Sequence, residues 1–175
     1  CSSDLASYIS KYIKSDLIKA SMSEVLETLI MKIEVKKSVF YLVNVYITPQ
    51  SNKMTALDEL LNYITELNIK RNENIILSGD FNIDLLNPSH DKELFDVFTL
   101  NLDIMPTIFT PTRIAKTSKS CIDNVCLGTH FDYRSSVLST DFSDHQTLLT
   151  ELFINNEAFE VPQKVMSRNF SSKNI

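Results

Sequence analysis

The chain has 175 residues, 43% of them hydrophobic, and a formal net charge of -5. This length suits one globular core rather than two, and no apolar run approaches the roughly 20 residues that a membrane-spanning helix needs. The excess of acidic residues argues against a protein that binds nucleic acid through its overall charge, because contacts to a phosphate backbone depend on Lys and Arg.

The first half of the chain predicts a strand followed by a helix. The segment from Leu5 to Ile18 fits either a helical period or a strand, and both readings stay open. Val39 to Ile47 is apolar at nearly every position and rich in β-branched and aromatic residues, which is typical of a strand buried on both faces. From Lys53 to Lys70 the apolar residues recur at helical spacing, so a helix is predicted there.

The middle of the chain predicts a strand that ends at a carboxylate residue. Residues 75–77 form a short apolar run that closes at Ser78 and Gly79, and Asp80 follows where the strand should emerge. Helical spacing returns around residues 94–102. Prolines at positions 106 and 111 then predict an extended passage.

Two further strands are predicted at Cys121 to Leu127 and at Gln146 to Ile154. From about residue 155 the hydrophobic pattern fades, which indicates a domain over 1–154 and a linker or frayed terminus over 155–175. Alternating strands and helices imply a layered α/β architecture whose polar residues gather at strand ends.

The cysteines give no sign of a disulfide framework. Cys1, Cys121 and Cys126 leave one thiol unpaired under any scheme, and the spacing of the last two fits no common zinc site. We expect Cys121 and Cys126 to fill the core and the protein to be intracellular. Because the chain begins with Cys1 and shows no secretory pattern, we also expect it to be a fragment.

Polar residues able to do chemistry follow or open the predicted strands at four places: Tyr46, Asp80 with Asn82, Asp123, and Asp144 with His145. Phosphodiester hydrolysis needs such a set, with a divalent cation, a group that orients water and a donor to the developing charge. Asp80 could activate the water, Asn82 could hold it, and His145 could be the donor with Asp123 as its partner.

Each of these residues taken alone also has an ordinary structural explanation. An Asp after a strand often caps backbone N–H groups, and Asp123 could be such a turn residue. Tyr46 alone is more typical of a core aromatic. The Asp144–His145 pair in isolation is more typical of a capped loop beside a strand.

Taken together and in order, five strings resemble the exonuclease/endonuclease/phosphatase superfamily, which includes pancreatic deoxyribonuclease: VNVYITP, LSGDFNIDLL, TPTRI, SCIDNVCL and SDHQTLL. The resemblance runs from about Glu27 to Ile154. It implies a DNase I-like α/β (α+β) fold, a four-layer sandwich of two mixed β-sheets flanked by helices, with the site at one edge of the sheets. The N-terminal part of that domain is expected to be missing.

The resemblance also implies a role for each matched residue. Asp80 and Asn82 would orient and activate the water, and Tyr46 would touch the scissile phosphate. Asp123 would pair with His145, which would bind a phosphate oxygen. Asp144 would help to hold a metal, Mg²⁺ or Mn²⁺, and Arg113 would bind substrate.

In detail the strings are most similar to the endonuclease domains of non-LTR retrotransposons, through TPTR and the tail from Arg168 to Ser171. This similarity implies a nuclear enzyme that nicks DNA, with a possible fused reverse transcriptase downstream. A local basic loop with Arg113, Lys116 and Lys119 could follow a phosphate backbone or be an ordinary solvated loop. Oligomeric state is not indicated.

The sequence departs from the family pattern at its beginning. The family's early Asn and its principal metal-binding Glu have no counterpart here, and Glu24, Glu27 and Glu34 are not assigned that role, because LETLIMKIEV resembles the strand that follows the catalytic Glu. Two alternatives therefore stay open. One is a phosphatase or lipid phosphodiesterase of the same superfamily, and the other is a catalytically inactive domesticated remnant that acts as a binding module.

Overall fold

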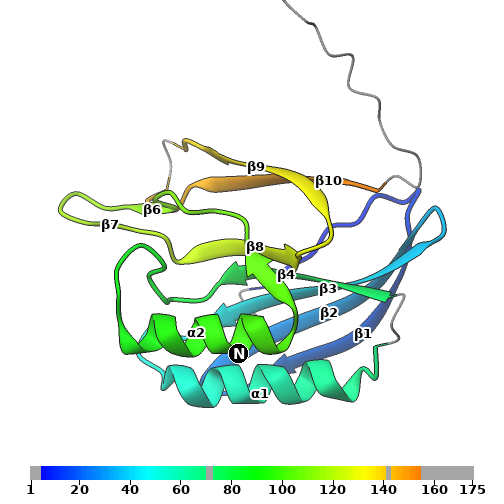
Figure 1. Ribbon diagram of the computed structural model, residues 1–175, viewed down its shortest axis with the longest axis horizontal. Helices are drawn as coiled ribbons and strands as arrows, with labels where there is room; N and C mark the ends of the chain where they lie inside the picture. The colour runs from blue at the N-terminus through cyan, green and yellow to red at the C-terminus, as the bar shows by residue number, and fades with distance from the viewer. Residues whose placement is uncertain (1–4, 70–72, 141–142, 155–175) are drawn as a thin grey trace, which may run out of the picture.

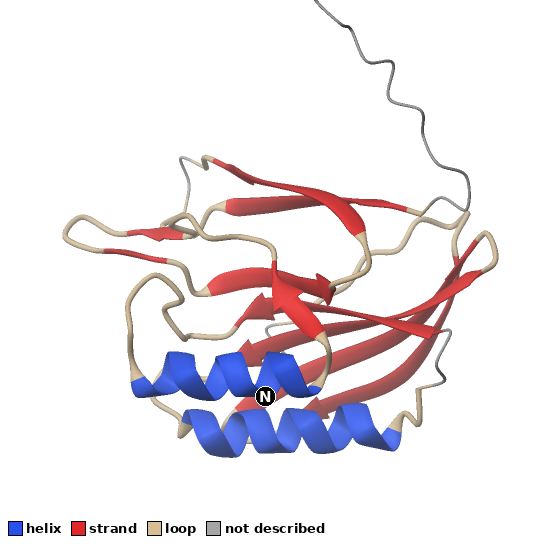
Figure 2. Cartoon of the chain, viewed as in Figure 1, coloured by secondary structure: helices blue, strands red, loops and turns tan. Residues whose placement is uncertain are grey.

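The computed structural model describes residues 5–69, 73–140 and 143–154. Two helices lie side by side against one face of a central sheet, and a two-stranded sheet lies on the other side (Figures 1 and 2). No described helix is long and apolar enough to cross a membrane. The predicted linker from residue 155 lies outside the described residues.

The helices are α1 (Lys53–Glu66) and α2 (His90–Asn101). The longer strands are β1 (Lys14–Met22), β2 (Leu26–Val35), β3 (Ser38–Ile47), β4 (Glu73–Asp80), β8 (Asp123–Gly128), β9 (Asp132–Leu138) and β10 (Thr147–Phe153). The short strands are β5 (Ile104–Pro106), β6 (Arg113–Ile114) and β7 (Lys119–Ser120).

The central sheet is mixed, in the order β1-β2-β3-β4-β8-β5. Strands β3 and β4 are parallel and are joined through α1, whereas the other neighbours are antiparallel. Strands β9 and β10 pair with each other, and β6 pairs with β7. The predicted fold class is thus confirmed, and the described residues form a helical layer and two sheets of the expected sandwich.

The core lies between the helices and the central sheet. Alternate residues of β2 and β3 face the helices, so Ile30, Val43 and Val45 are fully buried there. Leu60 of α1 and Phe95 of α2 close this layer from the other side. Burying each such side chain stabilises the fold by roughly 1.5–3 kcal/mol, which explains why the period-2 and helical patterns of the sequence locate these elements.

Helix α1 ends earlier than its apolar spacing predicts. Asn52 caps its N-terminus by accepting a hydrogen bond from the backbone N–H of Thr55 at 3.0 Å. The helix ends at Glu66 rather than Lys70, because Asn68 adopts a left-handed conformation with φ 48°. Asn tolerates this conformation and often terminates helices.

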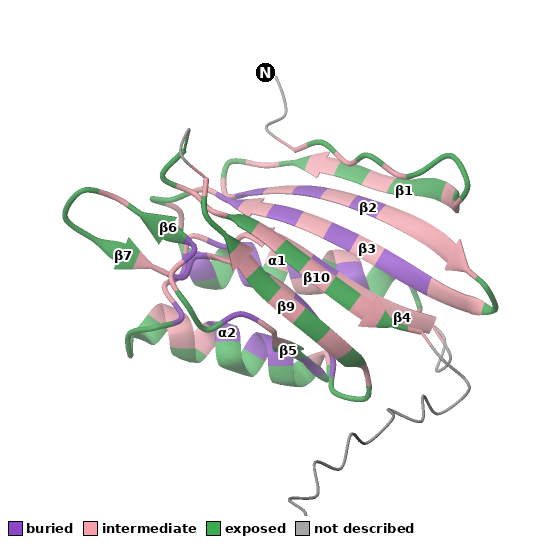
Figure 3. Ribbon diagram, turned by 90° about the horizontal axis from the view of Figure 1, so that it is seen from above, coloured by how far each residue is buried: buried purple, intermediate pink, exposed green. Residues whose placement is uncertain are grey.

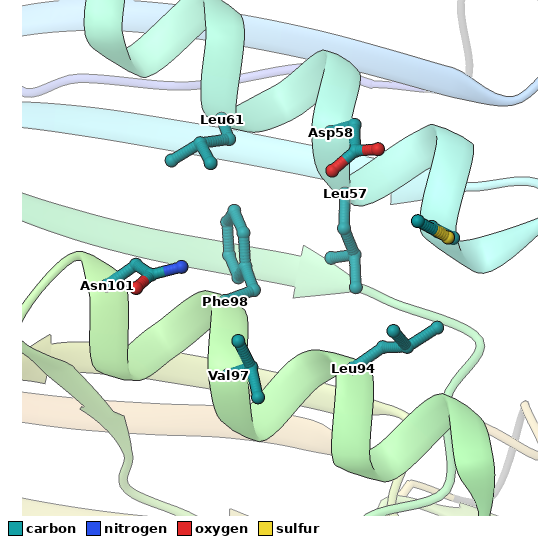
Figure 4. Close-up of a pocket in the computed structure, with 8 residues that line it drawn as sticks. Leu57, Asp58, Leu61, Leu94, Val97, Phe98 and Asn101 are labelled. Carbon is teal, nitrogen blue, oxygen red and sulfur yellow. The ribbon is translucent and has the colours of Figure 1, made fainter.

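The two helices leave an apolar groove between them, lined by Met54, Leu57, Asp58, Leu61, Leu94, Val97, Phe98 and Asn101 (Figure 4). Met54, one of the apolar residues at helical spacing in α1, is 56% exposed at this groove. Ala56 and Ile64 lie on the buried face instead. The apolar residues of α1 thus pack against the sheet and also line the groove.

The N-terminal region and β9 show where periodicity is ambiguous. Lys14–Met22 is a strand paired with β2, so the strand reading is correct for residues 14–18. Residues 5–13 form neither a strand nor a helix, so the strand reading is wrong there and the helical reading is wrong throughout. Asp132–Leu138, which the sequence analysis did not predict, alternates exposed and half-buried residues. Viewed from above, β9 and β10 lie toward the β4 side of the sheet, and β2 and β3 remain open to view (Figure 3).

Strand β4 approaches β3 closely at Gly79. Gly79 has φ +147°, and a Cβ built there would lie 1.9 Å from the carbonyl oxygen of Val45. Because the clash is with backbone atoms, only moving the two strands apart would relieve it. We therefore regard Gly79 as the residue that permits this strand register.

Replacing Gly79 by Ala should lower the free energy of unfolding by at least ~3 kcal/mol, because it adds both backbone strain and a clash. Urea unfolding followed by circular dichroism measures this loss. Gly128→Ala is the matched control: its new Cβ would meet side-chain atoms alone, the rings of His130 and Phe131, and we expect a cost below ~1 kcal/mol. Equal costs at the two glycines would contradict the assignment.

Candidate active site

The candidate site lies where β3, β4 and β8 bring polar residues to one edge of the sheet. Asp80 is the last residue of β4 and is paired in register with Asp123, the first residue of β8. Tyr46 of β3 is paired with Asp80 on its other side. Paired residues on neighbouring strands share one face, so these three side chains lie in a row on the face away from the helices.

His145 joins this row from the segment that precedes β10. Its Nδ1 lies 3.1 Å from both carboxylate oxygens of Asp123, which fixes the plane of the ring and leaves Nε2 available. Ligand atoms of Asp80, Asp123 and His145 all lie within 4.8 Å of one another. Residues 65 positions apart in the chain thus form one half-buried cluster.

The turn after β4 is fixed by its own polar groups. Asp80 Oδ1 accepts a hydrogen bond from the backbone N–H of Asn82 at 2.9 Å, and Asn82 adopts a left-handed conformation with φ 48°. The Asn82 side chain donates from Nδ2 to the carbonyl of Ile47 at 2.8 Å. Phe81 points the other way into the core and packs edge-on against Phe95. These bonds fix the Asp80 carboxylate and the Asn82 amide relative to the ends of β3 and β4.

Arg113 and Asp144 form an ion pair beside the cluster. Arg113 Nε donates to Asp144 Oδ2 at 2.8 Å, and both side chains are almost half exposed. The guanidinium lowers the pKa of the Asp144 carboxyl below its ordinary value, chiefly through this hydrogen bond. Asp144 does not join the cluster of Asp80, Asp123 and His145, so its role as a metal ligand stays a prediction.

Arg113 opens the β6–β7 hairpin, which projects beyond the sheets (Figure 1). A bridge pairs Arg113 with His145, and the N–H of Ile114 donates to the carbonyl of Asp144 at 2.7 Å. The hairpin is therefore bonded directly to the segment that carries His145. Lys116 and Lys119 are exposed on this hairpin.

Burial dominates the electrostatics of Asp80. The pKa of Asp80 is raised above its ordinary value, first by desolvation and then by the neighbouring charge of Asp123, while the bond from Asn82 and the charges of His145 and Arg113 act in the opposite direction. A carboxyl whose ionised form is disfavoured is suited to accept a proton. A nearby cation would favour the ionised form.

The donor set of the cluster fits a hard divalent cation. Two carboxylates supply the oxygen ligands that Mg²⁺ and Mn²⁺ prefer, and Mg²⁺ keeps several positions for water and phosphate oxygens. Asp80 has one oxygen free of the Asn82 bond, and Asp123 would coordinate next to its His145 contact. The identity of the metal is not fixed by these residues.

Three residues to which the sequence analysis gave no role hold the site together. Thr112 is fully buried, and its hydroxyl accepts from the N–H groups of Ile122 and Asp123 at 3.1 and 3.0 Å. Asp84 accepts from the N–H of Cys121 at 2.9 Å, and buried Asn124 accepts from the segment after β5. All three lie within the strings quoted above, which is the only signal that pointed to them.

The two described cysteines are structural. Cys121 and Cys126 are both fully buried, as predicted. Burial raises the pKa of the Cys121 thiol to about 11 and raises that of Cys126 further. Both thiols are therefore protonated at neutral pH and are poor nucleophiles. Cys1 lies outside the described residues.

No protein-family model and no curated protein matches the chain in sequence. Among solved structures, the endonuclease domain of TRAS1, a telomere-specific non-LTR retrotransposon, superposes with a TM-score of 0.67 at 13% identity, covering 82% of this chain and 70% of that one. An endonuclease/exonuclease/phosphatase family protein from Bacteroides thetaiotaomicron gives 0.56 at 15% identity, covering 82% and 68%. The chain has the DNase I-like fold.

A third neighbour with this fold is a phosphatase. The mannosyl-6-phosphatase of Bacteroides thetaiotaomicron superposes with a TM-score of 0.54 at 15% identity, covering 80% of this chain and 67% of that one. At such identities the DNase I-like likeness establishes the arrangement of strands and helices, and the chemistry must be argued from the site itself.

Thr112→Val should loosen β8 at the site. Two buried N–H donors would lose their acceptor, at a cost of ~2–4 kcal/mol in the free energy of unfolding. Urea unfolding measures this cost, and Thr112→Ser, which keeps the hydroxyl, should lose less than ~1 kcal/mol. A valine variant as stable as the serine variant would show that Thr112 does not hold Asp123.

Asp80→Asn should stabilise the cation-free protein. Because the pKa of Asp80 is raised in the folded state, the cost of the carboxylate to folding develops as the pH rises from the ordinary Asp pKa through the raised one, and it is absent at low pH. The variant should therefore unfold at higher urea concentration than wild type at about pH 8, with the gap closing toward about pH 4.

Adding Mg²⁺ should reverse this order at the higher pH, because the wild type binds the cation more tightly. Unfolding in EDTA and in excess Mg²⁺ separates the two effects. A variant less stable than wild type in EDTA at about pH 8 would show that the buried charge is not the dominant influence.

Proposed function

We propose that this protein is a metal-dependent phosphodiesterase that nicks DNA. The observation that supports the proposal is the cluster of Asp80, Asp123 and His145, held at one sheet edge of a DNase I-like fold. A bound Mg²⁺ or Mn²⁺ would neutralise the carboxylates and polarise the phosphate.

Each residue of the site then has a defined task. Asp80 orients a water molecule and takes its proton, and the amide oxygen of Asn82 accepts the second hydrogen of that water. His145, aligned by Asp123, donates a hydrogen bond from Nε2 to a phosphate oxygen as negative charge develops. Tyr46, next to Asp80, contacts the same phosphate.

The β6–β7 hairpin supplies contacts to a phosphate backbone. Lys116 and Lys119 are exposed on it, and Arg113 stands at its base beside His145. Positive side chains on a projecting hairpin position a duplex without reading its sequence. Such a local patch suits a substrate that extends away from the cluster, which favours a nucleic acid over a small phosphate ester.

We further propose that the enzyme serves a retroelement and acts in the nucleus. The motivation is the similarity of the TPTR string and of the tail from Arg168 to Ser171 to non-LTR retrotransposon endonucleases, together with the TRAS1 domain among the structural neighbours. A reverse transcriptase region downstream of residue 175 belongs to the same proposal. DNA is then the partner, and Asp144 is an additional metal ligand.

Nicking of supercoiled plasmid in Mg²⁺, with an EDTA control, tests the proposed reaction. Asp80→Ala and His145→Ala should each lower the rate by at least ~10²-fold, because both groups act on the reacting atoms. The assay uses the chain as given and a version extended upstream along its reading frame, since the family's early Asn and Glu would lie there.

Asp132→Ala is the matched control, since it removes an exposed carboxylate of β9 with no place in the cluster. It should nick at the wild-type rate. Near-wild-type nicking by Asp80→Ala or His145→Ala would refute the assignment of the site. If neither version nicks but a phosphate monoester is hydrolysed with the same dependence on Asp80, the phosphatase alternative replaces the nuclease. Binding of DNA without any hydrolysis favours the binding module.

A further inference from the structure

The loop that carries His145 is bonded to a threonine at the end of β9. This loop connects β9 with β10, and the structure describes its residues 139–140 and 143–146. The backbone N–H of Thr140 donates to Oε1 of Gln146 at 3.1 Å. The hydroxyl of Thr140 donates to the carbonyl oxygen of His145 at 2.7 Å. Both donor groups of this half-buried residue are thus bonded to His145 and to the residue that follows it.

Strand β9, which ends two residues before Thr140, is itself fixed to the central sheet. The hydroxyl of Ser135 donates to Oγ1 of Thr107 at 2.9 Å. Thr107 follows β5, and its backbone N–H donates to the buried side chain of Asn124 in β8. Asp123 is the first residue of β8. Thr140 therefore follows a strand that is anchored beside the carboxylate that His145 contacts.

The segment of His145 is held on its other side by residues at the start of the β6–β7 hairpin. The backbone N–H of Gln146 donates to the carbonyl oxygen of Thr112 at 2.7 Å, and a bridge pairs Arg113 with His145. The carbonyl oxygen of His145 accepts from Thr140. Bonds on both sides thus fix the peptide groups of this segment, and they set the direction in which the imidazole leaves the backbone.

We propose that Thr140 is a positioning residue for His145. Its hydroxyl holds the peptide of His145 so that Nδ1 stays 3.1 Å from the Asp123 oxygens and Nε2 points to the phosphate. This inference rests on the proposed function and adds a residue that acts through His145 alone. Misplacing a reacting group by about 1 Å can lower a rate by about 10²-fold, so one hydroxyl behind the imidazole matters to the reaction.

Thr140→Val removes the hydroxyl and keeps the shape of the side chain. In plasmid nicking with Mg²⁺ it should lower kcat about 10-fold and leave KM within about 2-fold, because the residues that contact the DNA backbone are unchanged. Thr140→Ser restores the hydroxyl and should recover at least about half of the wild-type kcat. Gln146→Leu removes the other bond of Thr140 and should lower kcat in the same way.

Thr147→Val is the matched control, because it makes the same change at an exposed residue at the start of β10. It should nick at the wild-type rate. Three results would each overturn the inference while the proposed function stands: a wild-type kcat in Thr140→Val, a rise in KM alone, or a loss of kcat that serine does not restore.

The protonation of the His145 ring nitrogens gives a test that needs no nicking. Protein with ¹⁵N-labelled histidine is measured by NMR in EDTA at about pH 8, and His145→Gln identifies the His145 signals. Nδ1 should carry a proton in wild type, because Asp123 accepts a hydrogen bond from it. In Thr140→Val, part of the population should carry the proton on Nε2 instead.

This difference should appear even if wild type never nicks a plasmid, in which case the proposed function fails and the positioning role of Thr140 stands. Identical His145 signals in wild type and Thr140→Val would overturn the inference. A wild-type Nδ1 without a proton would overturn it as well.

Discussion

The close approach of Gly79 to the carbonyl of Val45 is the constraint on which the site depends. Any side chain at position 79 would push β4 away from β3, and Asp80 would leave its position opposite Tyr46 and Asp123. The next peptide must then turn sharply, and Asn82 accepts the left-handed conformation that this turn needs. Gly79 and Asn82 are thus needed for the backbone conformation of this segment, and Asp80 is needed for the chemistry of the site.

The loops around the site are joined by backbone N–H groups that donate to buried or half-buried side chains. Thr112 accepts from Asp123 at the start of β8, Asp84 accepts from Cys121 two residues before β8, and Asn124 accepts from Thr107 after β5. Buried backbone donors must be paired, so each of these side chains fixes a loop that has no regular ladder of its own. Contacts on both sides therefore fix the position of Asp123. Its carboxylate can then align the ring of His145.

The sequence predicted those parts of this arrangement that depend on local chemistry. Strands β3 and β8 and the placement of Asp80 and His145 at strand ends follow from apolar runs that stop at polar residues. The extent of α1 and the existence of β9 did not follow, because a single residue in a left-handed conformation and a strand of alternating half-burial leave weak periodic signals.

Register was the larger omission. The row of Tyr46, Asp80 and Asp123 appears only when β3, β4 and β8 are paired, since pairing shifted by one residue would turn one of these side chains to the helical face. Thr112 and Asp84 were missed for a related reason. Their partners are backbone N–H groups of another segment, and a sequence gives no sign of which segment will lie nearby.

Because the chain is acidic, a polyanionic substrate would need a cation at the site in order to bind. Without a cation, Asp80 and Asp123 repel phosphate, and the ion pair with Asp144 engages the guanidinium of Arg113. A divalent ion at the cluster would change the local charge from negative to near neutral, and one that also drew on Asp144 would release Arg113 toward the substrate. Binding and hydrolysis would then depend on the same ion. A net charge of -5 is thus compatible with a nuclease whose attraction for DNA is confined to the cation and one hairpin.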